Sequence, residues 1–292
     1  MAVLPTDFQF SQASLQDYVD CPRRFQLRYV LQLAWPAQEV EPALENEQHM
    51  QQGAAFHRLV HRYALGIPAE DLSRAIGEPD LRRWWHNYLE RGPQELPETR
   101  YPEVLLSAPL AGYRLVARYD LIAVDAGRRA VIVDWKTSRK RTKREVLAER
   151  LQTKVYPYLL VRAGAHLNGD QAIAPEQVEM IYWFADYPEE PARFGYDTAQ
   201  YEAEEAYLTS LVAEIAELAL SLSNGLGDGD FPLTVQEQRC KFCPYRSLCQ
   251  RGVRAGTLDE VLDEALDAII EGEADASDAF DIDFEQIAEI AY

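Results

Sequence analysis

The sequence predicts an α/β fold in which helices flank a central sheet and one four-cysteine metal site joins the two ends of the chain. Three observations support this prediction. Residues 113–135 contain two apolar, β-branched runs with a turn between them. Segments whose apolar residues recur at helical spacing precede and follow these runs. The four cysteines of the 292-residue chain lie at one position near its start and three near its end.

The elements follow from local patterns of residue types. Helical periodicity predicts helices, in chain order, at residues 15–33, 53–65, around Trp84–Trp85, 142–163 and 198–222. Apolar and β-branched runs predict strands at residues 113–124, 130–135 and 178–185. The segment 125–129 between the first two strands contains Gly127 and predicts a hairpin turn. The glycine-rich segment 224–230 predicts a linker to the C-terminal cysteines.

The cysteine pattern is typical of a metal site with four thiolate ligands. Cys240, Cys243 and Cys249 form a Cys-x2-Cys-x5-Cys motif, and Cys21 provides the fourth thiol from far upstream. Four thiolates suit either zinc or an iron–sulfur cluster. Positive side chains nearby favour the thiolate form, and they are Arg23, Arg24, Lys241 and Arg246.

Other interpretations of the cysteines remain open at this point. They are four unrelated buried thiols, a redox pair of Cys240 and Cys243, or disulfides. The N-terminal residues show no basic stretch followed by an apolar core and a cleavage site. We therefore expect a cytoplasmic protein, and disulfides are the weakest alternative because they are rare in that reducing compartment. No apolar run is long enough to span a membrane, so we expect no membrane partner.

The formal net charge of −19 is distributed unevenly along the chain. Thirteen acidic residues and no lysine or arginine follow Arg254, and the rest of the chain has 35 acidic and 29 basic residues. A local basic surface can therefore still bind a polyanion. The predicted nucleic-acid-binding residues lie in the stretch 136–154, and they are Arg139, Lys140, Arg141, Lys143, Arg144 and Lys154. The alternative is a solvated charged face without a ligand.

Two carboxylates and a lysine lie on the predicted hairpin. Asp120 is on the first strand, and Asp134 and Lys136 end the second. Residues two apart on a strand share a face, so the carboxylate and the ammonium of Asp134 and Lys136 are expected to converge. Hydrolysis of a phosphodiester uses such a group, because carboxylates bind Mg²⁺ or Mn²⁺ and a lysine stabilises negative charge. The alternative is a structural ion pair at a strand end.

The chemically active residues occur in a distinctive order. In sequence they are Cys21, His57, Asp120, Asp134-Trp135-Lys136, Gln152, Tyr156, and the cysteines 240, 243 and 249. Gln152 and Tyr156 lie four residues apart, on one face of the predicted helix. This set resembles the RecB-like, iron–sulfur-containing branch of the PD-(D/E)XK nuclease superfamily, which includes the CRISPR adaptation exonucleases. The resemblance covers residues 14–249 and implies a restriction-endonuclease-like core, with a mixed central sheet flanked by helices.

The resemblance implies a divalent metal site. His57, Asp120 and Asp134 would bind Mg²⁺ or Mn²⁺, with the carbonyl of Trp135 as a further ligand. Glu103 also has a counterpart in the family, as a supporting or alternate ligand.

The same resemblance implies roles for the remaining residues. Lys136 would be the catalytic lysine, and Gln152 and Tyr156 would position the substrate strand. The four cysteines would hold a 4Fe–4S cluster of structural function, although zinc suits four thiolates as well. One departure is Arg118, because the family often has glycine two residues before the first aspartate.

The implied function is a metal-dependent DNA nuclease, an exonuclease on single-stranded ends, that acts in DNA repair, recombination or CRISPR adaptation. The alternative is a nucleic-acid-binding assembly subunit with a vestigial site, which recruits a helicase or recombinase through an acidic tail. A zinc-stapled scaffold that never binds DNA is a third interpretation.

The predicted domain organisation has two parts. Residues 1–254 form the nuclease domain, and residues 255–292 form an acidic C-terminal helix and tail. Apolar residues recur at helical spacing over 258–270 and predict an amphipathic helix. This tail is expected either to bind a protein partner or to cover the basic surface as a phosphate mimic.

Overall fold

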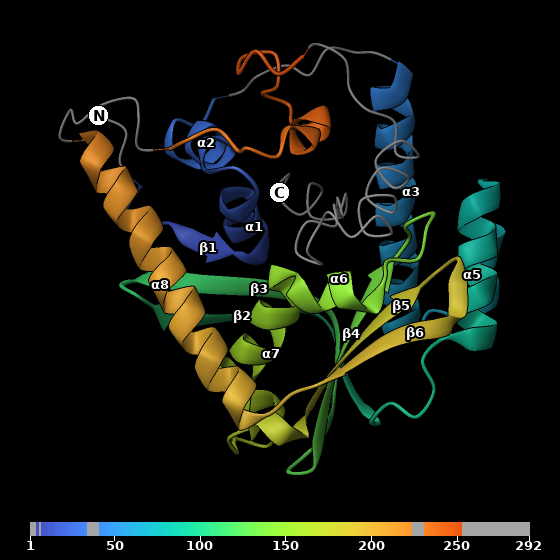
Figure 1. Ribbon diagram of the computed structural model, residues 1–292. Coiled ribbons are helices and arrows are strands. Elements are labelled where there is room, and N and C mark those ends of the chain that lie inside the picture. Colours follow the sequence, from blue (N-terminus) through green and yellow to red (C-terminus); the bar gives the residue numbers. More distant parts are fainter. Residues whose placement is uncertain (1–3, 6, 34–40, 224–230, 253–292) are drawn as a thin grey trace. The chain divides into compact units, whose positions relative to one another are not determined.

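The computed structural model describes residues 4–5, 7–33, 41–223 and 231–252. The chain divides into two compact units, whose elements are labelled in Figure 1. Among the described residues, we call them the terminal unit, with residues up to 48, 109–115 and from 206 onwards, and the sheet unit, with residues 49–108 and 116–205. The predicted acidic helix 258–270, the tail and the linker 224–230 lie outside the described residues.

The terminal unit contains short helices around an aromatic core. Its elements include β1 (Gln9–Ser11), α1 (Gln12–Asp20), α2 (Pro22–Phe25), a π-helical turn (Gln26–Val30) and a 3-10 turn (Glu237–Phe242). The ring of Phe25 stacks on Phe10 and on Phe231, with centroid distances of 6.2 and 6.4 Å. The predicted continuous helix 15–33 is wrong, because the backbone is extended at Cys21, immediately before Pro22. Proline disfavours helical backbone at the preceding residue.

The sheet unit contains most of the regular structure. Its helices are most of α3 (Glu41–Ala64), α4 (Ala69–Arg74), α5 (Pro79–Arg91), α6 (Arg144–Glu149), α7 (Leu151–Ala163) and the start of α8 (Thr198–Ser223). Its strands are most of β2 (Thr99–Leu110) and of β3 (Tyr113–Asp125), with β4 (Arg129–Lys136), β5 (Val178–Phe184) and β6 (Tyr187–Gly195).

The sheet is mixed, as predicted. Its strand order runs β3, β4, β5, β6, and β2 pairs with β3. The β3–β4 and β5–β6 pairs are antiparallel, whereas β4 and β5 are parallel. A parallel pair requires a crossover connection, which α6 and α7 provide. The predicted turn 125–129 is confirmed, since Asp125 pairs with Arg129 and Gly127 has a φ of 73°.

The two faces of the sheet have different partners (Figure 1). One face packs against α3, α4 and α5 in a cluster that includes Phe56, Leu59, Leu81, Trp84, Trp85, Val131, Val133, Trp135, Ile181 and Trp183. Odd-numbered residues of β4 lie in this cluster, so its even-numbered residues point to the opposite face. There α7 packs, and Thr153 and Tyr182 are hydrogen-bonded through their hydroxyls at 2.7 Å. Asp134 and Lys136 therefore face α7.

Three predictions about the elements were incomplete. The helix predicted over 142–163 is two helices, because Arg150 has extended backbone with a ψ of 141°. This break lets α6 bury Val146 and Leu147 while α7 buries its own apolar side. Strand β6 was not predicted, because its sequence YPEEPARFG has the prolines and charges that edge strands use against aggregation. Strand β2 was missed for a similar reason, since it too contains two prolines.

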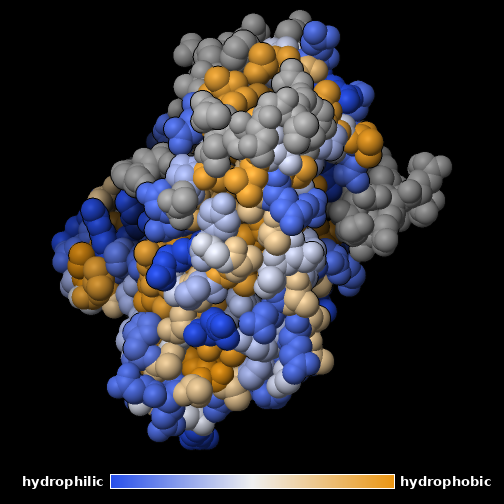
Figure 2. Space-filling view, turned by 90° about the vertical axis from the view of Figure 1, so that its left-hand side faces the viewer, coloured by the Kyte–Doolittle hydropathy of each residue, from blue (hydrophilic) through white to orange (hydrophobic). Residues whose placement is uncertain are grey.

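The surface of the described residues is mixed in polarity. Figure 2 shows one face, on which apolar side chains form separate patches between hydrophilic ones. No helix in the described part of the chain is both long and apolar enough to cross a membrane.

Glu204, near the start of α8, accepts a hydrogen bond from the Tyr196 hydroxyl at 2.5 Å. Burial raises the pKa of Glu204 to about 7. The folded chain thus binds the proton of the Glu204 carboxyl more tightly than the unfolded chain does. The stabilisation of the folded state by this proton is complete below about pH 4.5 and is lost as pH rises through 7. We expect the free energy of unfolding of the wild type to fall by about 2 kcal/mol between pH 5 and 8 because of this group, and Glu204→Gln to remove that fall. Urea unfolding at several pH values measures this, with exposed Glu202→Gln as control, and equal pH slopes would contradict it.

Candidate active site

Asp120 lies where strands β3 and β4 separate. The paired register of the two strands ends at Leu121 and Val133. Beyond that point the backbone N–H of Trp135 donates to Oδ2 of Asp120 at 2.9 Å, in place of a strand-to-strand bond. The other carboxylate oxygen, Oδ1, is 3.0 Å from Nδ1 of His57 on α3. Two contacts from different elements thus orient the Asp120 carboxylate.

Glu103 stands on β2 with a left-handed backbone, at a φ of 54°. That conformation is strained for a residue with a side chain, and such strain concentrates at functional sites. Burial, and then the negative charge of Asp120, raise the pKa of Glu103, while Arg118, His57 and His61 oppose this shift. Two carboxylates are therefore close together in a partly buried place, which a bound cation would stabilise.

Arg118, which stands where the family often has glycine, lies close to Glu103. Its Nε is 3.8 Å from Oε2 of Glu103, and its side chain remains 43% exposed. Arg118 therefore extends towards Glu103.

Asp134, Lys136 and Gln152 form a hydrogen-bonded polar group between β4 and α7. Nζ of Lys136 is 3.0 Å from Oδ2 of Asp134. Gln152 links the two residues, because its Nε2 donates to Oδ1 of Asp134 at 2.5 Å and its Oε1 accepts from Nζ of Lys136 at 3.1 Å. Asp134 and Lys136 are only 4% and 5% exposed. This confirms that the two side chains converge, and buried charges of this kind require such mutual pairing.

Tyr156 lies deeper than the other predicted residues of the site. It is 1% exposed, and its hydroxyl donates to the carbonyl of Arg118 at 2.9 Å. Tyr119 returns the contact, because its hydroxyl donates to the carbonyl of Tyr156, also at 2.9 Å. These reciprocal bonds attach α7 to β3 immediately before Asp120. Tyr156 therefore helps to hold the site together, while Gln152 reaches its charged groups directly.

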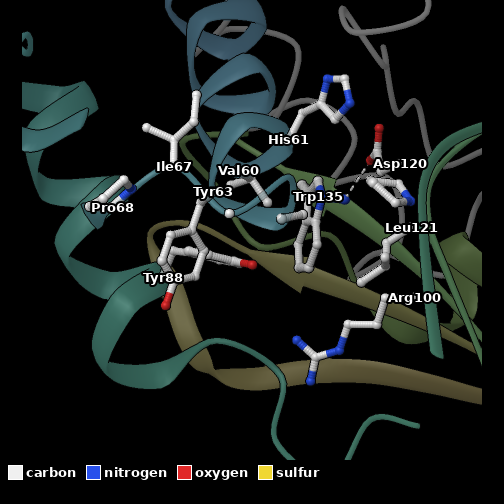
Figure 3. Close-up of a pocket in the computed structure, with 13 residues that line it drawn as sticks. Val60, His61, Tyr63, Ile67, Pro68, Tyr88, Arg100, Asp120, Leu121 and Trp135 are labelled. Atoms are coloured by element: carbon white, nitrogen blue, oxygen red, sulfur yellow. Dashed lines mark hydrogen bonds between the residues drawn. The ribbon is translucent and has the colours of Figure 1, made fainter. Parts of the chain in front are cut away.

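A cavity of about 390 Å³ opens beside Asp120 on the α3 and α5 side of the sheet (Figure 3). Aromatic and aliphatic side chains form most of its wall, among them Tyr63 of α3, Tyr88 of α5 and Trp135 of β4. His61 and Arg100 add polar groups. The Asp120 carboxylate thus contacts His57 and the Trp135 N–H and also borders an amphipathic pocket.

The predicted nucleic-acid-binding residues follow Lys136 directly, and several contact the sheet. Arg141 and Arg144 lie over the rings of Phe184 and Phe194, with distances of 5.9 and 4.5 Å to the ring centroids. Their guanidinium groups donate to the carbonyls of residues 190 and 193. Lys154 pairs with Glu149 at 2.9 Å. Arg139 is exposed, and Lys140 and Lys143 are half-buried in the same segment.

The four cysteines of the terminal unit line one small cavity. Burial raises the pKa of both Cys240 and Cys243 to about 11, and the negative charges of the other cysteine thiolates contribute to the rise for Cys240. Three guanidinium groups also line this cavity, from Arg24, Arg239 and Arg246. Of the positive residues predicted near the thiols, Arg24 and Arg246 are thus in place.

The donor atoms around Asp120 and around the cysteine cavity can be compared with those that metal ions prefer. Among the described residues, no group of three or more histidine, cysteine, aspartate or glutamate side chains is arranged closely enough to hold a metal ion. The donor types nevertheless fit: carboxylates and an imidazole around Asp120 suit Mg²⁺ or Mn²⁺. Four thiols around one cavity suit zinc or iron–sulfur.

Sequence reasoning identified Asp120 and Trp135 but missed the other residues of the pocket. His61 follows His57 by one helical turn, and this i, i+4 spacing is a signal that could have identified it. Tyr63, Tyr88 and Arg100 come from α3, α5 and β2, and no local pattern links them.

Comparison with known proteins identifies the family. The model of the PD-(D/E)XK nuclease superfamily matches residues 9–250. The crystal structure of SSO0001 is similar at 16% identity and a TM-score of 0.37, covering 82% of this chain and 85% of the other. A Eubacterium rectale protein with a provisional exonuclease name is similar at 10% identity and a TM-score of 0.44, covering 75% and 82%. A comparison with curated proteins gives no match. The chain belongs to the PD-(D/E)XK nuclease superfamily.

Proposed function

We propose that this protein is a metal-dependent DNA nuclease that acts as an exonuclease on single-stranded ends. One observation carries the proposal: Asp134 is paired with Lys136 at the end of β4, and Asp120 of the neighbouring strand β3 accepts a hydrogen bond from the backbone N–H of Trp135, the residue between them. Asp120 is oriented by His57 and the Trp135 amide, and Asp134 is paired with Lys136. An isolated structural ion pair would not need the second carboxylate, the histidine or the strained Glu103.

The metal ligands would be His57, Asp120, Asp134 and the carbonyl of Trp135, with Glu103 in a supporting position. When bound, Mg²⁺ or Mn²⁺ would polarise the phosphodiester and its attacking water. The Asp120 carboxylate is already oriented by the Trp135 N–H, so little reorganisation is needed there. Glu103, whose pKa is raised, would contribute most at a pH high enough to ionise it.

Lys136 would stabilise the negative charge that develops on the phosphate. Its Nζ is held by Asp134 and by Gln152, so its position is fixed before substrate arrives. Gln152 orients both charged groups and would shift its bonds towards the substrate. The basic residues of the segment after Lys136 would contact the DNA backbone, with Arg139 the most accessible of those placed on the loop.

We further propose that the cysteine cavity holds a 4Fe–4S cluster, with zinc as the less favoured occupant. Cys21, Cys240, Cys243 and Cys249 would be its ligands, and three lining arginines would offset the negative charge of four thiolates. The cluster would join the N-terminal helices to the C-terminal segment. A cytoplasmic role in DNA repair, recombination or CRISPR adaptation is the corresponding pathway, by resemblance to the RecB-like branch.

The test is degradation of end-labelled single-stranded DNA by anaerobically purified protein. We expect a ladder of shortened products with Mg²⁺ or Mn²⁺, and none with EDTA. Asp120→Asn keeps the size of the side chain but removes a charged ligand, so it should lower the rate by about 10²-fold or more. Arg128→Ala, at the exposed hairpin turn, serves as the matched surface control. Cutting that persists in EDTA, or at full rate in Asp120→Asn, would overturn the proposal.

A further inference from the structure

The cavity beside Asp120 is lined by charged as well as aromatic side chains. The Asp120 carboxylate borders it on one side, and Arg100, at the start of β2, borders it elsewhere. In Figure 3, the rings of Tyr63 and Tyr88 lie to one side of the Trp135 indole and Asp120 to the other. A ligand that fills this space therefore meets aromatic rings on one side and the charged groups of Asp120 and Arg100 on the other.

The aromatic wall is preformed. Tyr63 and Tyr88 meet edge to face, with centroids 6.1 Å apart and an interplanar angle of 90°. Tyr88 meets the Trp135 ring in the same way, at 5.3 Å and 86°. Tyr63 remains 40% exposed although it is a large aromatic residue at the cavity. Flat π-faces that solvent can reach are the surfaces on which nucleobases stack.

Arg100 is suited to bind an anion. Within the described chain its guanidinium has no carboxylate partner, and its Nε makes a long hydrogen bond of 3.4 Å to the carbonyl of Pro97. A guanidinium presents several donors that match a phosphate. The cavity volume of about 390 Å³ lies within the range of roughly 300–1,000 Å³ typical of ligand pockets.

We propose that this cavity binds one nucleotide of the DNA strand, with its base against Tyr63 and Tyr88 and a phosphate on Arg100. This inference deepens the proposed function and rests on it for the identity of the substrate. Because Asp120 lines the same cavity, the bound nucleotide adjoins the phosphodiester that is cut. The pocket would then hold the terminal nucleotide and restrict cutting to strand ends.

The direct test is equilibrium binding of dAMP, deoxyadenosine and inorganic phosphate to the metal-free protein in EDTA. Wild type should bind dAMP more tightly than either part. Arg100→Ala should weaken dAMP binding about tenfold and leave deoxyadenosine unchanged, whereas Tyr63→Ala should weaken both about tenfold. Tyr63→Phe keeps the ring and should bind as wild type does. Arg128→Ala and Tyr207→Ala, at exposed positions outside the cavity, are the matched controls.

A second measurement uses single-stranded DNA whose terminal residue either carries a base or is abasic. Wild type should remove the intact terminal residue about tenfold faster, and Tyr63→Ala should lose this preference. Equal dAMP binding by wild type, Arg100→Ala and Tyr63→Ala would overturn the inference while leaving a metal-dependent nuclease intact. Selective dAMP binding without any cutting would instead support the pocket and overturn the proposed nuclease.

Discussion

Lys136→Met is expected to lower metal-dependent cutting by about 10³-fold while DNA binding in EDTA changes little. The Lys136 ammonium contacts Asp134 and Gln152. In the proposed function, negative charge on the substrate would develop beside this ammonium. Methionine keeps the length of the side chain but supplies no charge or donor. Initial rates on end-labelled single-stranded DNA, beside a binding titration, measure both quantities. A rate within tenfold of wild type would mean that Lys136 is structural.

Loss of folding must be separated from loss of chemistry in this variant. Removing Lys136 breaks its buried ion pair with Asp134. Breaking a buried pair by removing one partner costs about 3–5 kcal/mol. The double variant Asp134→Asn/Lys136→Met replaces the charged pair by neutral groups, and Asn can still accept the hydrogen bond from Gln152. We expect it to recover thermal stability but no activity. Recovery of both would indicate that the single variant failed only because it unfolded.

Cys243→Ala is expected to remove the bound cluster and to lower Tm by roughly 10 °C or more. The C-terminal segment 231–252 has little regular structure besides one 3-10 turn, and it contributes three of the four thiols around the cavity. A metal site is therefore expected to supply much of the stability that holds this segment to Cys21. Iron, sulfide and zinc analysis of anaerobically purified protein, together with thermal melts, measures the effect.

Leu248→Ala is the control for the cysteine variant. Leu248 neighbours Cys249 in sequence but its side chain is 39% exposed, so its truncation should affect neither metal content nor Tm. Purified protein with neither iron nor zinc and an unchanged Tm in Cys243→Ala would favour four unrelated buried thiols. Stoichiometric zinc without iron would support a metal site with four cysteine ligands but would show that its occupant is zinc rather than a 4Fe–4S cluster.

Local patterns were reliable where one element carries the whole signal. The hairpin at 125–129 and the strand that ends in Asp134-Trp135-Lys136 follow from alternation and from a turn with glycine, and both are present. The convergence of Asp134 and Lys136 follows from the two-residue period of a strand. The helix predicted over 142–163 failed because its apolar spacing continues across Arg150 although the backbone does not.

The sequence by itself determined which chemical groups this protein has and in what order: the aspartates, the lysine, the histidine and the four thiols. Only the tertiary structure decided how Gln152 joins Asp134 to Lys136, that Glu103 has a left-handed backbone, and that a pocket opens beside Asp120. The physical reason is that these features are contacts between elements far apart in the chain. Strand pairing, the crossover through α7 and the packing of α3 and α5 create them, and local periodicity does not encode their geometry.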